Sequence, residues 1–368
     1  MPLSELANEI LLHIFSSCNS VHDALALAST SRHMHSLLNS SHRLPILYQA
    51  AEAQFGPLHD VTRLVTYNVS QPPTIPRPAP PRSFALLKRL LEVGRTANAW
   101  AEIYPQQKWR GGDSSSRRFL TSMERYNLRR ACYRIWLYNL AFHSPFYPRA
   151  TRLSPPIVRQ RAALLRPWPA RELAEMLDLH SILRQVLHSY ICPSNGTVIR
   201  RHRARYPDDP FPMVAVTSPG RYAREHGAYH HSSVQFHSTP HTTNYLYSAP
   251  TRNHRCGYKE NYGIAVEGWG DEISHYYVIE DMLKLDPSQL LYLYTRILET
   301  KAGPVFNPGV SAKGLVESYV AGLAGGEWFE NNGETFAETV GFVEGERGGE
   351  LGDLKGLVED GVEGIARV

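Results

Sequence analysis

The stretch that decides the fold lies near the start of the chain and reads Leu6-Ala7-Asn8-Glu9-Ile10-Leu11-Leu12-His13-Ile14-Phe15. Its apolar side chains recur every three or four residues, which places them on one broad stripe of an α-helix. Asn8 precedes most of the stripe, and its short polar side chain is expected to cap the first turn. The stretch therefore predicts an N-terminal amphipathic helix.

Two further short helices are expected before residue 45. One opens at His22-Asp23, after the break at 18–20, and carries Leu25 and Ala28; the other passes through Leu37. Three short helices bury little surface by themselves, because small units expose a large share of their area. Since their apolar residues fall on more than one face, the pattern indicates a unit that needs a partner.

The spacing of this segment resembles an F-box. The two matching parts read Leu6-x-x-Glu9-Ile10-Leu11-x-x-Ile14-Phe15 and Asp23-x-Leu25-x-Leu27-Ala28-x-x-Ser31-Arg32-x-x-x-x-Leu37. The segment is similar in particular to the F-box of a large fungal family, although that family has proline at the position of Ala7. The sequence from Arg130 to Tyr138 also looks like part of the helical body of that family.

The resemblance implies a fold, a partner and a set of contacts. An F-box implies three helices that dock on the Skp-type adaptor of a cullin-RING ubiquitin ligase. The contacts carried over to this chain are apolar: Leu6, Ile10, Leu11, Ile14, Phe15, Leu25, Leu27 and Leu37.

Length and composition describe a globular protein. The chain has 368 residues, of which 42 % are hydrophobic and 10 % aromatic, which suits two domains or one large domain with appendages. Its four cysteines are scattered without paired spacing, no signal peptide is expected at its start, and no apolar run approaches the length of a membrane span. These features predict a protein of the cytoplasm, the nucleus or both.

Charge is distributed very unevenly. Residues 77–225 contain 26 Lys and Arg against 10 Asp and Glu, whereas residues 257–368 contain 8 against 20. One interpretation is that the basic middle and the acidic C-terminal third pack together. The other is a basic surface for nucleic acid or an acidic partner. We favour packing, because no nucleic-acid motif accompanies the arginines.

The pattern divides the chain into four parts and predicts a mainly α fold. Residues 1–45 form the F-box-like unit, 46–82 a helical extension and a proline-rich linker, 83–321 a mostly helical body, and 322–368 a mobile, glycine-rich acidic tail. The strongest body helix is expected from Ser122 to Phe142. Its arginines, expected on a solvated face paired with carboxylates, are Arg125, Arg129, Arg130 and Arg134.

Residues 193–263 are expected to be rich in loops, with short strands at 214–216, 234–236 and 245–247 as an alternative. The histidines between His226 and His254, with Cys256, suggest zinc ligands. However, no second cysteine or acidic ligand completes a tetrahedral set at the usual spacing. We therefore expect neither a metal nor another cofactor.

The sequence predicts an interaction protein rather than an enzyme. It lacks a phosphate-binding glycine loop, a Gly-x-Ser-x-Gly elbow and a His-Glu-x-x-His motif. The expected function is that of a substrate receptor, which docks on a Skp-type adaptor and through it on a cullin, and whose body holds a substrate protein. Two alternatives stay open: a basic binding module without a ligase role, and an adaptor-binding protein that works outside the ligase.

Overall fold

The computed structural model consists of helices, as the sequence predicts, and it describes most of the chain. The described residues are 6–69, 80–110, 117–144, 146–205, 272–302 and 334–367, with residues 207, 269, 315, 316 and 319. All the regular elements of these ranges are helices. Most of the proline-rich linker, the expected strands and the histidines between His226 and His254, with Cys256, lie outside the described residues.

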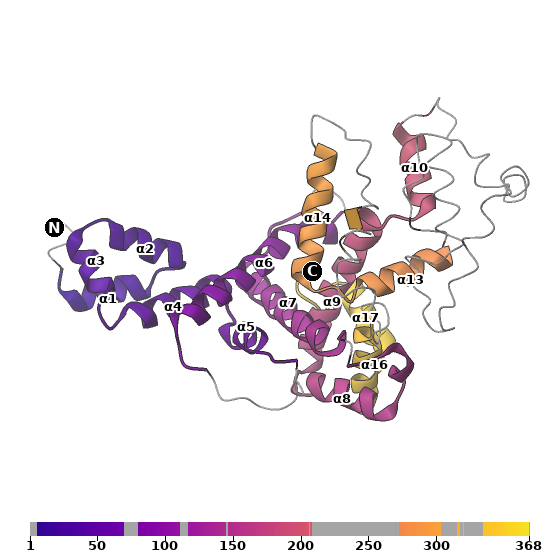
Figure 1. Ribbon diagram of the computed structural model, residues 1–368, viewed down its shortest axis with the longest axis horizontal. Coiled ribbons are helices and arrows are strands. Elements are labelled where there is room, and N and C mark those ends of the chain that lie inside the picture. Colours follow the sequence, from indigo (N-terminus) through magenta and orange to yellow (C-terminus); the bar gives the residue numbers. More distant parts are fainter. Residues whose placement is uncertain are drawn as a thin grey trace, which may run out of the picture.

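The first five helices form an N-terminal unit and the arm that joins it to the body. Figure 1 shows the unit at one end of the molecule, with α4 leading from it toward the remaining helices. The unit's helices pack on one another and on α4, and α4 in turn packs on α6. The bounds are α1 (Asn8–Ser16), α2 (Val21–Ser29), α3 (Arg32–Leu38), α4 (Arg43–Phe55) and α5 (Leu58–Val65).

The body is built around α7, which packs on α5, α6 and α9. Buried side chains project from α7 in all directions rather than from one stripe, so it is a central helix and not a surface one. Its start is fixed by a capping box, in which Thr121 and Glu124 each bond to the other's backbone N–H. The bounds of the body helices up to residue 205 are α6 (Phe84–Lys108), α7 (Ser122–Phe142), α8 (Pro155–Leu165), α9 (Ala170–Val186) and α10 (Asn195–Arg205).

Short stretches of other helix types connect these elements. A 3₁₀ turn, η3, spans Arg149–Thr151, and a π-helical turn, η4, continues α9 over Leu187–Ile191. The expected loop-rich segment thus begins with a helix, because α10 occupies part of it. None of the helices that the structure describes combines the length and apolar character needed to cross a membrane.

The C-terminal third completes the core. The helix α13 (Glu272–Met282) packs on η4, and α14 (Pro287–Ala302) packs on α6 and η4. Asp286 caps α14: its Oδ1 accepts hydrogen bonds from the backbone N–H groups of Ser288 and Gln289.

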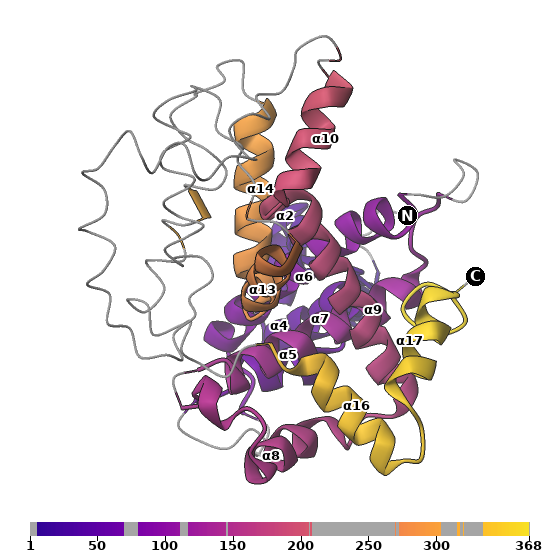
Figure 2. The ribbon, with the colours of Figure 1, turned by 90° about the vertical axis from the view of Figure 1, so that its right-hand side faces the viewer.

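The prediction of a mobile tail is wrong for its described part. Figure 2 shows α16 (Phe336–Glu346) beside α8 and α17 (Leu351–Glu359) beside α9. Phe336 and Val340 are buried, and so is Ile365 beyond the last helix. Gly341, Gly345, Gly352 and Gly356 lie in helices whose apolar faces are covered by the body, so tertiary packing overrides their low helix propensity.

Candidate functional site

The N-terminal unit begins without the cap that its sequence suggests. Asn8 is already helical, the N-cap position belongs to Ala7, and no side chain caps α1. The next two helices are capped by serines: Ser20 accepts a hydrogen bond from the N–H of Asp23, and Ser31 accepts one from that of Met34. These caps set the two turns and thereby the angles between the three helices.

Two of the eight predicted adaptor contacts lie inside the unit. Leu11 and Phe15 are fully buried in the hydrophobic core, on a helix that packs against α3 and α4. Residues on the inner side of α1 hold the three helices together, and a partner cannot reach them without unfolding the unit. We therefore remove Leu11 and Phe15 from the predicted docking surface.

The other six remain accessible to a partner. Ile10 is 49 % exposed and Leu25 is 44 % exposed, although both are large aliphatic side chains. The half-buried members of the set are Leu6, Ile14, Leu27 and Leu37. We call these six residues the apolar face of the N-terminal unit.

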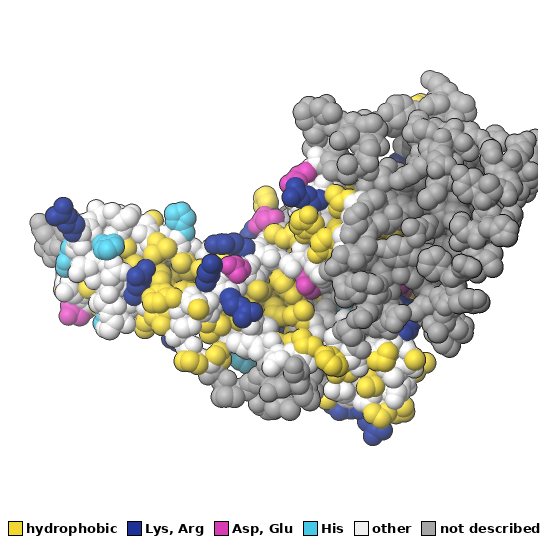
Figure 3. Space-filling model, in the orientation of Figure 1, with side chains coloured by type: hydrophobic (Ala, Val, Ile, Leu, Met, Phe, Trp, Pro, Cys, Tyr) yellow, Lys and Arg dark blue, Asp and Glu magenta, His cyan; other side chains and the backbone are white. Residues whose placement is uncertain are grey.

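Few charges interrupt this part of the surface. Between residues 6 and 42 the acidic side chains are Glu9 and Asp23, and the only Lys or Arg is Arg32. No ion pair of the described chain involves these residues. Figure 3 shows hydrophobic side chains gathered over the unit, with wide neutral areas around them. A surface of this kind suits a helix-on-helix contact better than an electrostatic one.

Ala7 departs from the F-box pattern in residue type but not in conformation. Its backbone has φ −57° and ψ 145°, and proline holds φ near −65°. Its N–H makes no hydrogen bond among the described backbone contacts, so a proline would remove none. The chain thus enters α1 along the path that a proline at this position would impose.

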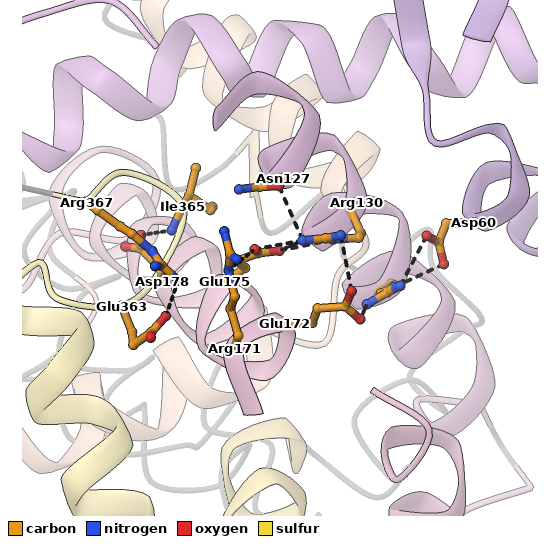
Figure 4. A network of polar contacts seen from close by, with 11 residues as sticks. Asp60, Asn127, Arg130, Arg171, Glu172, Glu175, Asp178, Glu363, Ile365 and Arg367 are labelled. Atoms are coloured by element: carbon orange, nitrogen blue, oxygen red, sulfur yellow. Dashed lines mark hydrogen bonds and ion pairs between the residues drawn. The ribbon is translucent and has the colours of Figure 1, made fainter. Parts of the chain in front are cut away.

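The arginines of α7 form a second, very different cluster. Arg134 donates to Asp60 on α5 at 3.0 Å and to Glu172 on α9 at 2.6 Å, and its guanidinium lies 4.7 Å from the centre of the Trp168 ring. Arg130 binds Glu175 in a bidentate pair. Figure 4 shows these side chains reaching from α7 toward α5 and α9.

This network is enclosed rather than solvated. Arg134 and Asp60 are less than one tenth exposed, and Glu175 is fully buried. Burial raises the pKa of the Glu175 carboxyl, although Arg130 opposes the shift. The prediction that these arginines pair with carboxylates is confirmed for Arg125, Arg130 and Arg134, whereas the prediction of a solvated face is wrong. Arg129 instead donates to the backbone oxygen of Gly56 at 2.9 Å, at the end of α4.

The basic middle and the acidic C-terminal third pack against each other, as we favoured from their charges. Four arginines of the middle form ion pairs with carboxylates of the last hundred residues, namely Arg149 with Asp281, Arg152 with Glu338, Arg166 with Glu346 and Arg184 with Glu280. Much of the basic excess is therefore used within the fold.

Asp178 on α9 fixes the end of the chain. It accepts hydrogen bonds from Tyr104 at 2.6 Å, from Lys108 at 2.9 Å and from the backbone N–H of Ile365 at 3.0 Å. Gly364 has φ +114°, and a Cβ there would come within 2.7 Å of this carboxylate. Local sequence patterns do not predict this anchor, because its members are distant in the chain.

The described residues contain no cluster of metal-ligating side chains. Over the described ranges, no three His, Cys, Asp or Glu side chains gather as metal ligands would. Cys132 and Cys192 are buried thiols, and burial raises the pKa of Cys132.

No protein-family model matches the chain. No curated protein and no solved structure matches it either. The candidate site is therefore the apolar face of the N-terminal unit, identified from its own geometry and sequence pattern.

Proposed function

We propose that this protein is the substrate receptor of a cullin-RING ubiquitin ligase of the SCF type. In this proposal the N-terminal unit docks on a Skp-type adaptor, which connects it to a cullin, and the helical body holds a substrate protein. The receptor contributes proximity between the substrate and the ubiquitin-transfer machinery rather than chemistry of its own.

The observation that carries the proposal is the exposure of Ile10 and Leu25 within an F-box-like pattern. Both positions belong to the motif, and both large aliphatic side chains are about half exposed. Covering them on binding removes apolar area from water. Full burial of an exposed side chain of this size is worth about 1.5–3 kcal/mol, and the gain here is roughly half of that because each side chain is already about half buried. Leu6, Ile14, Leu27 and Leu37 enlarge the same contact.

The position of the unit also favours docking. It stands at one end of the molecule and reaches the body through α4. A partner that covers the three helices therefore leaves the far end of the body open for a substrate.

Binding to purified Skp-type adaptor tests the proposal. We expect the full chain to co-purify with the adaptor, and the double variant Ile10→Asp, Leu25→Asp to lose binding, because two buried carboxylates would oppose an apolar contact. The matched control is Leu153→Asp, which places a carboxylate at a 77 % exposed leucine of the body. Failure of the folded wild-type chain to bind, or equal loss in the control, would rule out this docking mode.

A further inference from the structure

A cleft of about 460 Å³ opens where the C-terminal end of α6 meets the η4 turn. Arg110, Arg117 and Arg118 line it together with Gln107, Phe119 and Tyr190. It belongs to the body, and none of its lining residues comes from the N-terminal unit.

The positive charge of this cleft is only partly neutralised. Arg118 is engaged by Glu124 through two hydrogen bonds of 2.6 and 2.7 Å, and Glu102 at the rim is bound by Arg125 at 2.8 Å. Arg110 and Arg117 are exposed, and neither forms an ion pair within the described parts of the chain. Two guanidinium groups are thus left to meet an anion.

A further cation from α10 stands beside them. Arg201 donates to the backbone oxygen of Ser189 at 2.7 Å, which holds it against η4. Burial lowers its pKa, and the neighbouring charges of Arg110 and Arg200 add to this effect. Because Arg110 and Arg200 depress the pKa of Arg201, both lie within electrostatic reach of it, and positive charge is concentrated beside the cleft.

Tyr190 and Gln107 form a polar floor with unused hydrogen-bonding capacity. The amide of Gln107 donates to the Tyr190 hydroxyl at 3.4 Å, which leaves the hydroxyl proton for an acceptor in the cleft. Gln107 is only 3 % exposed, and its Oε1 has no hydrogen-bond partner among the described residues. That oxygen is itself buried, so the group that the floor offers to a ligand is the Tyr190 hydroxyl.

Phe119 gives the cleft an apolar edge. Its ring is 80 % exposed although it lies next to Arg118 in the chain and lines the same cleft. The guanidinium of Arg110 lies 5.3 Å from the centre of the Tyr190 ring, which orients its remaining N–H groups. The cleft thus offers two cations that are unpaired among the described residues, a hydroxyl donor and an aromatic surface.

We propose that this cleft binds a peptide segment that carries a phosphoserine or phosphothreonine. Arg110 and Arg117 would bind the phosphate oxygens, the Tyr190 hydroxyl would donate to the same group, and Phe119 would contact an apolar side chain of the peptide. The exposed Phe119 ring favours a peptide over a bare phosphate dianion, because a bare dianion has no apolar group to contact it. Nucleic acid fits less well, because it needs a long track of free cations and the arginines of α7 are paired.

Fluorescence anisotropy with a degenerate peptide library tests this assignment. Each peptide contains a central phosphoserine flanked by mixed residues, and an unphosphorylated library of the same composition serves as reference. We expect the full chain to prefer the phosphorylated library at least roughly tenfold, and this preference to disappear in Arg110→Ala, Arg117→Ala. Tyr190→Phe should weaken binding several-fold, since it keeps the ring and removes the donor.

The matched control is Lys88→Ala, Arg89→Ala, which removes two charges from the exposed surface of α6 away from the cleft. If the control loses as much affinity as the cleft variant, the effect is general electrostatics and the proposal fails. It also fails if an oligothymidylate binds more tightly than the phosphorylated library and is lost in the cleft variant. Adaptor binding is measured in parallel and should be unchanged in Arg110→Ala, Arg117→Ala, so the two proposals fail separately.

Discussion

The N-terminal unit and the centre of the body differ in which side chains they expose and which they bury. The unit leaves large aliphatic residues such as Ile10 half exposed and contains few charges. The body does the reverse around α7, where Arg134 and Glu175 are buried and every charge of the network meets a partner.

The N-terminal unit therefore presents a surface that a partner can still cover, whereas the polar groups around α7 are already satisfied within the fold. Apolar groups in contact with water gain free energy when a partner covers them, whereas a buried ion pair has already satisfied its charges within the fold. An interaction site is therefore expected where apolar area remains uncovered, and the arginines of α7 are expected to act on stability. The following predictions test that division, beginning with the largest effect.

Removal of Arg134 should cost the most stability. Arg134→Ala leaves the buried carboxylate of Asp60 without its cation, and breaking a buried pair in this way costs about 3–5 kcal/mol. The free energy of unfolding, measured by urea titration with tryptophan fluorescence, should fall by this amount. Arg125→Ala removes the partly exposed partner of Glu102 and should cost less than about 1 kcal/mol. Equal losses in the two variants would show that the α7 network is not enclosed.

Acid should destabilise the body through His143. Burial lowers the pKa of His143 to about 3, with Lys284 and Arg161 adding to this effect and Glu334 opposing it. The unfolded chain takes up the proton near pH 6.5, so the unfolded state binds more protons and stability falls as the pH drops from about 6.5 toward 3. Over this range the protonation of His143 changes the free energy of unfolding by about 1.4 kcal/mol per pH unit.

The variant His143→Gln keeps a polar side chain and removes the titration. Its free energy of unfolding, measured between pH 7 and pH 4, should therefore vary less with pH than that of the wild type. Parallel curves for the two proteins would contradict the assignment of this slope to His143.

Gly94 marks the close contact between the arm and the body. A Cβ at this position would lie 2.5 Å from ring atoms of Phe55, so Gly94→Ala should push α4 from α6 and cost about 1–3 kcal/mol. The same substitution at Gly356 on α17, where a Cβ meets nothing within 4 Å, should instead stabilise the protein by up to about 1 kcal/mol. In thermal unfolding, Gly94→Ala should lower the melting temperature and Gly356→Ala should raise it.

The smallest effect is expected at Ala7. Because its φ already suits proline, Ala7→Pro should stabilise the unit by about 0.4–1 kcal/mol by restricting the unfolded chain. The same preorganisation should tighten adaptor binding a few-fold. Ala7→Gly should lower the stability of the unit and weaken adaptor binding. A loss of stability in Ala7→Pro would show that the backbone path into α1 differs from the one described.

Local signals in the sequence predicted the elements well. The bounds of α7 and the Asp286 cap of α14 follow from apolar spacing and capping chemistry, which act within a few residues. Local signals did not predict the C-terminal helices α16 and α17. Their stability comes from packing on α8 and α9 rather than from their own glycine-rich sequence.

The candidate site was predicted only in part. Periodicity places Leu11 and Ile10 on the apolar side of one helix, but it does not say which neighbour covers each of them. The structure buries Leu11 and leaves Ile10 half exposed. The cleft at Arg110 had no sequence signal, because it depends on which arginines of the basic middle find carboxylates in space.

The most direct test of this account is hydrogen–deuterium exchange of the full chain with and without purified Skp-type adaptor. The account predicts slower exchange in peptides from residues 6–38 on addition of the adaptor, and unchanged exchange in peptides from α7 and α9. Binding that protects the body and leaves residues 6–38 unchanged would contradict it, and so would the absence of binding by the folded chain.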